Sequence, residues 1–336
     1  MKICVVGAGA IGGLMGARFA LAGQEVTLID LGAHLAAIRA DGLKLIGPGG
    51  EEEVARELEA TDDMAEAGPQ DLVVIAVKAH QIAALAPAMR ALFGNDTAVL
   101  TVQNGIPWWY FQNHGGKFDG HRIEAVDPGG AIAANIETER IIGCVVYPAG
   151  ALVAPGVISH VEGNRFPVGE LDGSTSDRVE AIAELFNGSG FKSYVLDNIR
   201  SEIWLKLWGN LSFNPISALS HATMVDICRL GLTRELAATM MLEAQAIAHK
   251  LGIEFRHTIE RRLEGAEKVG KHKTSMLQDV EAGRGLEVEA LVGAVVELAR
   301  LTDTPTPHID AVYALATLLN QTMAEEKAAF PPRPAA

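Results

Sequence analysis

Three glycines near the start of the chain and an acidic residue downstream have the spacing of a dinucleotide-binding site. Gly7, Gly9 and Gly12 form a G-x-G-x-x-G motif. In this motif the first glycine allows a tight turn, the second lets the backbone approach a pyrophosphate, and the third lets the next helix lie close to the sheet. Amide groups at the start of that helix face the phosphate charge. The predicted cofactor-binding residues are therefore those of the motif, Gly7, Ala8, Gly9, Ala10, Ile11 and Gly12, together with the acidic residue downstream, Asp30.

The segments around the motif have the pattern that this chemistry requires. Residues 3–6 are a short apolar run typical of a buried strand, and apolar residues recur at helical spacing between 11 and 19. Gly23 ends the predicted helix, and residues 25–29 predict a second strand that Asp30 closes. A motif without this context would equally fit a glycine-rich turn that binds nothing, so the context favours a nucleotide site.

The acidic residue at the end of the second predicted strand indicates which dinucleotide is bound. A carboxylate at Asp30 can accept hydrogen bonds from the adenosine ribose hydroxyls, but it repels a 2′-phosphate. Leu31 supplies no positive charge, and Arg39, the nearest cation downstream, lies too far along the following helix. The expected cofactor is therefore NAD(P)H, with NADH favoured over NADPH.

Two other polar residues follow predicted buried strands. Apolar runs at 71–77 and 98–102 predict strands, and Lys78 and Asn104 come shortly after them. The alternation of strands and helices predicts an α/β fold with a doubly wound parallel sheet, a Rossmann-type domain. Because ligands bind beyond the carboxyl ends of such strands, we expect both residues to lie near the glycine motif.

Composition and charge argue against several other classes of protein. The 336 residues suffice for two domains, and no apolar run reaches the ~20 residues that a membrane span needs. The first strand begins so close to Met1 that no leader is expected. A formal net charge of −14 argues against nucleic acid or an anionic membrane as partner. Three cysteines fit a reducing cytoplasm, and the histidines lack metal-ligand spacing, so we expect a cytoplasmic protein without metal.

The sequence pattern changes near Asp197, where helical segments replace the alternating strands and helices. Helices are predicted over 199–213, 231–252, 258–269, 274–282, 287–302 and 309–326. We therefore predict a Rossmann-type domain over 1–197 and an all-helical substrate or dimerisation domain over 198–328. The proline-rich residues 329–336 are expected to form a disordered tail. The oligomeric state is left open, a homodimer included.

Four polar residues spaced by four positions mark one face of the first helix in this second domain. That face carries, in order, Glu202, Lys206, Asn210 and Asn214. Lys206 is either the ordinary ion-pair partner of Glu202 or a functional group, and the two asparagines either cap backbone groups or bind a substrate. Pro215 predicts that the helix ends or kinks at Asn214.

An aromatic cluster, residues 108–111, lies in a less regular stretch between 106 and 140. It is either a local hydrophobic plug or part of a wall of a substrate pocket. Because large aromatic side chains are mostly buried in cores, the plug is favoured.

Several blocks of the chain together resemble the ketopantoate reductase (2-dehydropantoate 2-reductase) family. They are MKICVVGAGAIGG at the N-terminus, VKAHQ at 77–81, QNG at 103–105, EIWLKLWGNLSFNPISAL at 202–219 and SMLQDVEAGRGLEVEAL at 275–291. The last two are specific, whereas the first is common to many dinucleotide enzymes. The resemblance covers nearly the whole chain. It implies a Rossmann domain followed by a helical domain, and the reduction of a 2-keto acid to a 2-hydroxy acid by a nicotinamide hydride.

The resemblance also implies roles for individual residues. Lys206 matches the family's general acid, which would protonate the alkoxide that hydride transfer leaves. Glu287 matches an acidic residue that would hydrogen-bond the substrate or orient Lys206. The implied substrate-binding residues are Asn104, Asn210, Asn214 and Ser275, and the implied cofactor-binding residues include Lys78, Asn104 and Ala149.

The chain departs from the family pattern at three places. Members that use NADPH usually carry an arginine at the end of the second strand, where this chain has Asp30-Leu31. A further asparagine of the family is replaced by Met224, and the stretch 107–140 is longer than usual. The first departure puts NADPH in doubt, and the other two put ketopantoate in doubt.

The activity expected from these observations is the NAD(P)H-dependent reduction of ketopantoate to pantoate, a step of pantothenate biosynthesis. The alternative is an NAD-dependent D-2-hydroxyacid dehydrogenase of the mandelate type. A non-catalytic NAD-sensing protein would need the glycines and Asp30 but neither Lys206 nor Glu287, so it is less favoured. The expected partner is a small 2-keto acid, with no nucleic acid and no membrane.

Overall fold

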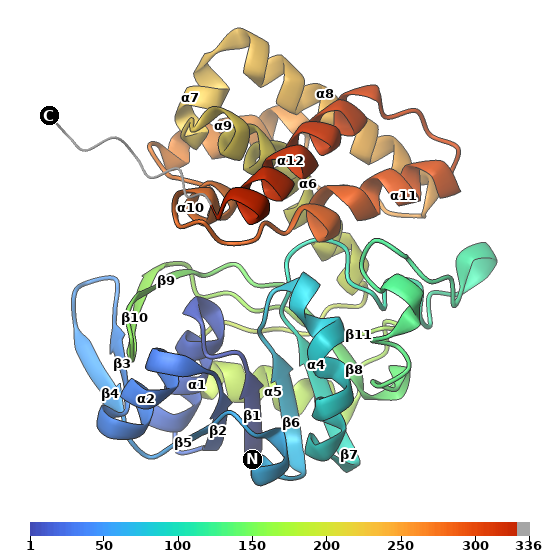
Figure 1. Cartoon of the computed structure of the whole chain (residues 1–336). Helices are drawn as coiled ribbons and strands as arrows, with labels where there is room; N and C mark the ends of the chain where they lie inside the picture. Colours follow the sequence, from blue (N-terminus) through green and yellow to red (C-terminus); the bar gives the residue numbers. More distant parts are fainter. Residues whose placement is uncertain (328–336) are drawn as a thin grey trace, which may run out of the picture. The chain divides into compact units, whose positions relative to one another are not determined.

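The N-terminal sequence folds into a largely parallel sheet, as its pattern of strand, turn, helix and strand predicts, with an antiparallel pair at one edge. In the computed structural model, which describes residues 1–327, β1 pairs in parallel with both β2 and β6 (Figure 1). Seven strands within the described residues make this sheet. In spatial order they are β11 (Val168–Glu170), β8 (Ile141–Cys144), β7 (Phe93–Thr101), β6 (Gln70–Ile75), β1 (Lys2–Val6), β2 (Glu25–Ile29) and β5 (Glu59–Thr61).

The register of this sheet aligns the ends of the strands that precede the predicted site residues. Val6 is paired with both Ile29 and Ile75, and Ile75 is paired with Thr101. The strands therefore end side by side, and the segments that leave them begin at one edge of the sheet.

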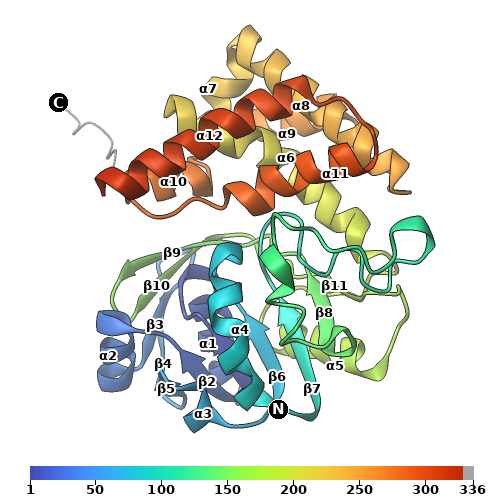
Figure 2. The ribbon, with the colours of Figure 1, turned by 45° about the vertical axis from the view of Figure 1, so that its right-hand side comes forward.

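Helices of the first unit cover both faces of the sheet. They are α1 (Ala10–Leu21), α2 (Gly32–Asp41), α3 (Met64–Ala67), α4 (Ile82–Met89) and α5 (Asp177–Gly188), with short 3-10 turns η1 (Ala79–Gln81), η2 (Arg90–Leu92), η3 (Gly116–Phe118) and η5 (Thr138–Arg140). A further 3-10 turn, η4 (Pro128–Gly130), lies at the boundary with the second unit. Phe19 of α1 meets Phe186 of α5 edge to face, so these two helices share one face. Right-handed connections put α4 on the other face, as Figure 2 shows.

A smaller sheet packs on the other side of α1. Its order is β4 (Glu52–Ala55), β3 (Leu43–Ile46), β10 (Val157–Glu162) and β9 (Ala149–Ala154). Helix α1 contacts strands of both sheets, and Leu14, Met15 and Phe19 on it are fully buried. Burial also raises the pKa of the Cys4 thiol on β1 to about 12, so the thiol stays protonated.

The second unit is helical. It contains α6 (Ile199–Ser220), α7 (Met224–Arg229), α8 (Gly231–Lys250), α9 (Ile259–Val269), α10 (Ser275–Glu281), the π-helix η6 (Glu289–Gly293), α11 (Ala294–Leu301) and α12 (Pro307–Glu326). Two short segments from the N-terminal half, 104–107 and 123–128, also pack in this unit. The prediction of a single boundary near Asp197 missed both of them.

The prediction that the first helix of this unit ends or kinks at Asn214 was wrong in its end point, because α6 continues through Pro215 to Ser220. Beyond the proline, Ile216, Ser217 and Ala218 are almost completely buried. Their burial offsets the helical hydrogen bond that proline cannot donate. The helices near 231, 258, 274 and 309 begin within two residues of their predicted starts. Helix α7 was not predicted, and the expected tail at 329–336 lies outside the described residues.

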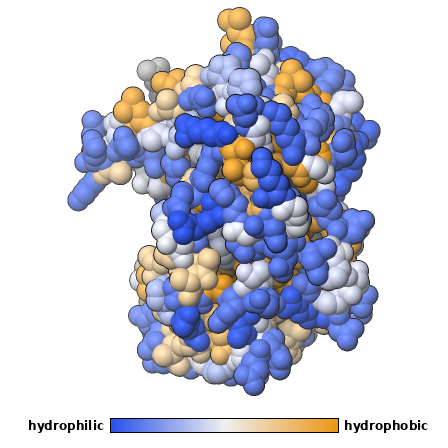
Figure 3. Space-filling model, turned by 90° about the vertical axis from the view of Figure 1, so that its right-hand side faces the viewer, coloured by the Kyte–Doolittle hydropathy of each residue, from blue (hydrophilic) through white to orange (hydrophobic). Residues whose placement is uncertain are grey.

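Two general features complete the fold. No helix within residues 1–327 is long and apolar enough to cross a membrane, and no cluster of three metal-binding side chains occurs among these residues. The face in Figure 3 is mostly hydrophilic, with hydrophobic side chains in small groups.

Candidate active site

The glycine-rich turn after β1 has the geometry that its motif predicts. Gly7 has φ +97°, which favours glycine, and its N–H donates to the Ile29 carbonyl oxygen. A Cβ on Gly12 would lie 1.9 Å from the Gly7 carbonyl oxygen, so only glycine lets α1 start this close to the turn. A Cβ on Gly9 would meet nothing within 4 Å. The turn is therefore open at Gly9, where a pyrophosphate would approach.

Asp30 lies directly behind this turn. One carboxylate oxygen accepts the Ala8 N–H at 2.8 Å, and the other accepts the Leu31 N–H at 2.7 Å. Each oxygen has a second lone pair that remains available for a ribose hydroxyl. The residue therefore holds the turn, and its carboxylate keeps lone pairs for a further hydrogen-bond donor.

The residues that follow Asp30 in the chain bear on the choice between NADH and NADPH. Leu31 is 68% exposed and carries no charge. Arg39, in the last turn of α2, donates from Nε to the Ala60 carbonyl oxygen at 2.8 Å and pairs with Asp62 at 3.5 Å. These contacts hold the Arg39 guanidinium on β5 and the loop after it.

Other predicted cofactor residues border the same turn. A Cβ on Gly7 would lie 2.7 Å from Cγ1 of Val77, which precedes Lys78. Ala149 begins β9, and a Cβ on the next residue, Gly150, would lie 3.3 Å from the Ala10 carbonyl oxygen. Both Lys78 and Ala149 therefore belong to segments that adjoin the glycine-rich turn.

Gln103 is a residue whose contacts sequence reasoning missed. Its Nε2 donates to the carbonyl oxygens of Ile75 at 2.6 Å and Val77 at 3.1 Å. These bonds fix the chain as it leaves β6, just before Lys78. The QNG block gave a signal at this position, but its long-range partners cannot be read from the sequence.

The candidate residues of the second unit are grouped around the polar row of α6. Lys206 Nζ donates to Asn104 Oδ1 at 2.6 Å, although 102 positions separate the two residues. Asn214 Nδ2 lies 3.4 Å from Oγ of Ser275, the first residue of α10. Asn210 lies between Lys206 and Asn214 on the same face, since a spacing of four places residues one helical turn apart. Four of the six predicted catalytic and substrate-binding residues thus meet in pairs, Asn210 lies on the helix face between them, and Glu287 lies on a different segment.

Buried contacts fix the orientation of α6. Trp204 and Trp208 are fully buried, Trp208 stacks on Phe255, and its Nε1 donates to the Met241 carbonyl oxygen at 2.7 Å. These contacts occupy one side of α6 and leave the side of Lys206 and Asn210 partly exposed.

The partner of Glu202 bears on the two readings of Lys206. The Glu202 carboxylate is 1% exposed and accepts two hydrogen bonds from Arg256, at 2.6 and 3.0 Å. A bidentate arginine is a strong partner for a carboxylate. Glu202 therefore has a strong partner other than Lys206. An ion pair with Lys206 is not needed to explain why the Glu202 carboxylate is buried.

The π-helix holds the loop that carries Asn104. The Ile106 N–H donates to the Ala290 carbonyl oxygen at 2.9 Å, and Gly105, with φ +88°, lets the backbones meet because a Cβ there would lie 2.2 Å from that oxygen. Glu287 lies at the start of the same turn, and its carbonyl oxygen accepts the Leu291 N–H. The backbone between Glu287 and Leu291 therefore carries Glu287 and also contacts the loop of Asn104.

The aromatic cluster at 108–111 is buried, as the plug interpretation expects. Its four side chains are at most 4% exposed, and Trp109 Nε1 donates to Thr101 Oγ1 at 2.9 Å.

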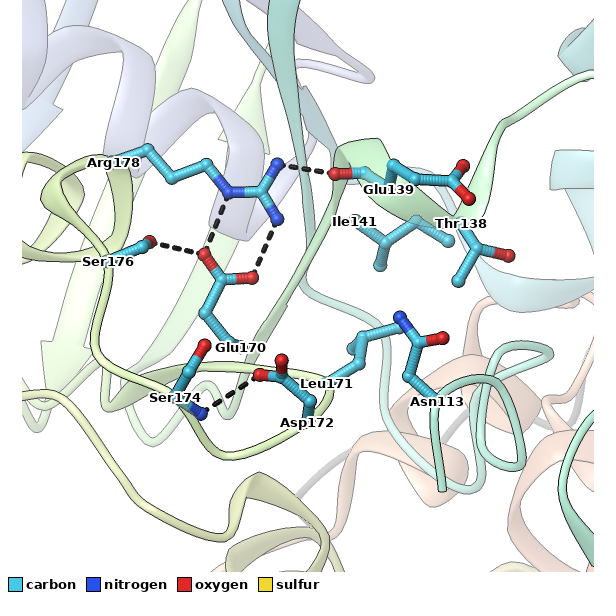
Figure 4. Close-up of a pocket in the computed structure, with 10 residues that line it drawn as sticks. All are labelled: Asn113, Thr138, Glu139, Ile141, Glu170, Leu171, Asp172, Ser174, Ser176 and Arg178. Carbon is cyan, nitrogen blue, oxygen red and sulfur yellow. Dashed lines mark hydrogen bonds and ion pairs between the residues drawn. The ribbon is translucent and has the colours of Figure 1, made fainter. Parts of the chain in front are cut away.

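A pocket of about 390 Å³ in the first unit holds none of the predicted site residues (Figure 4). It lies where β8 begins, which is the opposite end of that strand from the carboxyl edge where α/β proteins bind ligands. Arg178 spans it and pairs with the buried carboxylate of Glu170, and this hydrogen bond raises the pKa of Arg178. The residues that line it are Asn113, Thr138, Glu139, Ile141, Glu170, Leu171, Asp172, Ser174, Ser176 and Arg178.

Comparison with known proteins places this geometry in a family. Residues 3–173 match the family model "Ketopantoate reductase PanE/ApbA", and residues 198–320 match its C-terminal counterpart. The chain belongs to the ketopantoate reductase family. It is 54% identical to a 2-dehydropantoate 2-reductase of Mesorhizobium japonicum over 94% of this chain and 96% of that protein.

Solved structures share this fold. A structure from Ralstonia solanacearum, described as a ketopantoate reductase, superimposes on this chain with a TM-score of 0.91. The two chains are 40% identical, and the match covers 96% of this chain and 98% of that one. A D-mandelate dehydrogenase in complex with NADH and anilino(oxo)acetate shares the fold at 23% identity, with a TM-score of 0.82 over 96% and 99% of the two chains.

Proposed function

We propose that this protein reduces ketopantoate to pantoate with a nicotinamide hydride, the reaction of pantothenate biosynthesis that its relatives' names describe. The observation that carries this proposal is the Lys206–Asn104 pair, at 2.6 Å on the partly exposed side of α6, in a chain 54% identical to a 2-dehydropantoate 2-reductase. The pair joins an ammonium donor to an amide in the two blocks, QNG and EIWLKLWGN, that carry the family's site.

The residues present fit the dinucleotide that this activity needs. The Gly7–Gly12 turn is open at Gly9 and would hold the pyrophosphate, with Ala8, Ala10 and Ile11 in the same turn. Asp30 would accept hydrogen bonds from the adenosine ribose, and Lys78, Asn104 and Ala149 complete the proposed set. When bound, the cofactor supplies the hydride that adds to the keto carbon.

The chain's own residues would then deal with the charge that develops on the substrate oxygen. The Lys206 ammonium stabilises the developing alkoxide and donates a proton to it. Asn104, Asn210, Asn214 and Ser275 offer amide and hydroxyl groups to the substrate carboxylate and hydroxyl. Glu287 either hydrogen-bonds the substrate or orients Lys206.

We further propose that NADH is preferred to NADPH. Asp30 presents a carboxylate where a 2′-phosphate would lie, Leu31 supplies no charge, and Arg39 is held by Ala60 and Asp62.

The same pair, Asp30-Leu31, supports a second candidate, an NAD-dependent dehydrogenase of the mandelate type. A D-mandelate dehydrogenase with NADH bound shares this fold, although its 23% identity says nothing of the substrate.

Initial rates with ketopantoate, benzoylformate and pyruvate, each with NADH and with NADPH, test the proposal. We expect the highest kcat/KM with ketopantoate and NADH. A higher kcat/KM with benzoylformate would favour the mandelate-type enzyme. Binding of NADH without turnover of any 2-keto acid would favour a sensing protein.

A further inference from the structure

A buried histidine in the first turn of α2 has both ring nitrogens in hydrogen bonds. The His34 side chain is 7% exposed, with Nε2 at 2.9 Å from the Ala8 carbonyl oxygen. Its Nδ1 lies 2.9 Å from the Gly156 backbone nitrogen. Because the Gly156 N–H can only donate, Nδ1 must accept, and the ring hydrogen is on Nε2. Nε2–H therefore donates to the Ala8 carbonyl.

The carbonyl that His34 holds belongs to the peptide bond between Ala8 and Gly9, in the middle of the glycine-rich turn. In a trans peptide the C=O and the N–H point in opposite directions. A carbonyl fixed toward His34 therefore directs the Gly9 N–H away from His34. That amide is one of the groups that a pyrophosphate would meet, on a residue whose Cβ position is open.

Three neighbouring residues, Gly13, Asp30 and Gly156, support this arrangement. A Cβ on Gly13 would lie 2.7 Å from the same Ala8 carbonyl oxygen, so a side chain there would displace it. Asp30 accepts the Ala8 N–H and thus holds the preceding peptide bond. The Gly156 carbonyl accepts the Lys44 N–H, which ties the far side of His34 to β3.

We propose that His34 is a positioning residue for the dinucleotide, which holds the Ala8–Gly9 peptide so that its N–H faces the pyrophosphate. This inference rests on the proposed cofactor site and adds to it a specific donor, Nε2–H. It predicts that the bond to Ala8 matters for cofactor affinity and the bond to Gly156 does not, although both stabilise the fold.

Two amide substitutions separate these bonds. In His34→Gln the side-chain NH₂ reaches the place of Nε2 and can still donate to Ala8. In His34→Asn the side-chain oxygen takes the place of Nδ1 and can still accept from Gly156, but nothing reaches Ala8. Both variants lose one hydrogen bond and some volume, so we expect similar decreases in Tm.

The measurement is the Kd for NADH from fluorescence titration, with kcat for ketopantoate at saturating NADH and Tm from thermal unfolding. We expect His34→Gln to keep the Kd within about threefold, and His34→Asn to raise it about tenfold, as loss of one positioned donor would. We expect kcat to stay within about twofold for both. The control is His160→Asn, since His160 is another buried histidine of the same unit but bonds to the Gly163 carbonyl.

Other outcomes decide against the inference. Equal affinities for the Gln and Asn variants would leave His34 a purely structural residue. If His34→Asn does not fold, Gly13→Ala displaces the same carbonyl, and an unchanged Kd in that variant would overturn the inference. An unmodified protein that binds neither NADH nor NADPH would overturn the proposed function together with this role. NADH binding without keto acid reduction would remove only the proposed reaction.

Discussion

The two units hold their candidate binding groups in opposite ways. In the first unit, backbone amides of one turn would meet the ligand, and the side chains of Asp30 and His34 hold that turn from behind. In the second, side chains such as Lys206 would meet the ligand, and backbone contacts such as Ile106 to Ala290 hold their segments. Substitutions should therefore act differently: in the first unit through the shape of the turn, and in the second through the loss of a reacting group.

The largest effect is expected for Lys206→Ala. Loss of a general acid lowers kcat by about 100- to 10,000-fold. The Kd for NADH should barely change, because the glycine-rich turn belongs to the other unit. Stopped-flow and steady-state rates with ketopantoate give kcat, and fluorescence titration gives the Kd. The matched control is Lys250→Ala, which removes a surface lysine of the same unit that bonds to the Thr302 and Asp303 carbonyls. Turnover within a few-fold of the unmodified enzyme would refute the assignment of Lys206.

The second largest effect concerns Asp30 and Leu31. The 2′-phosphate of NADPH carries close to two negative charges, which a carboxylate a few ångströms away repels by several kcal/mol at an effective dielectric near 20. Screening and side-chain rotation reduce this, so we expect kcat/KM to favour NADH by about 10- to 1000-fold. Leu31→Arg should narrow the preference, and adding Asp30→Ala should invert it.

The structure adds a consequence to the double substitution. Asp30 also accepts the Ala8 N–H, so its removal loosens the glycine-rich turn and should weaken both cofactors somewhat. Asp41→Ala, which removes an acid at the exposed end of α2, controls for the change in net charge. A preference of the unmodified enzyme for NADPH would mean that a cation such as Arg39 reaches the phosphate.

The same contrast explains how much of the molecule the sequence could predict. The first unit's binding turn is contiguous, and the roles of Gly7 and Gly12 depend on the motif and on the strand before it. The geometry of this turn could therefore be predicted from the local sequence. The contacts of His34 with Ala8 and Gly156 did not, because a histidine 122 positions from its donor leaves no periodic signal.

The second unit was predictable mainly by resemblance. The spacing of four on α6 placed Lys206, Asn210 and Asn214 on one face, but no local pattern joins Lys206 to Asn104. The passage of α6 through Pro215 and the π-turn at η6 depend on burial and on tertiary contacts such as Tyr313 with Glu289. Those contacts have no counterpart in propensity or periodicity.

A third prediction concerns stability in the second unit. Arg256→Ala leaves the buried carboxylate of Glu202 without its bidentate partner, and we expect the free energy of unfolding to fall by about 1–3 kcal/mol. Urea unfolding followed by tryptophan fluorescence measures this, since Trp204 and Trp208 lie on α6 beside Glu202. Arg229→Ala, which removes an exposed pair with Glu267 at 3.4 Å, should cost less than about 0.5 kcal/mol. Equal losses for the two variants would contradict the importance of burial here.

The smallest effect is expected for Ser275→Ala. Its Oγ lies 3.4 Å from Asn214 Nδ2, at the long end of a hydrogen bond, so little of the position of Asn214 depends on it. The hydroxyl would contribute mainly by contacting the substrate, and losing one such neutral hydrogen bond raises KM for ketopantoate by about two- to tenfold. We expect kcat to stay within about twofold, because the proton comes from Lys206. The control is Ser220→Ala, at the far end of α6, where Oγ bonds only to the Ile216 carbonyl and the Ala222 N–H within the described residues. A fall in kcat as large as that of Lys206→Ala would mean that Ser275 takes part in proton transfer, and the division between binding and reacting side chains in this unit would have to be redrawn.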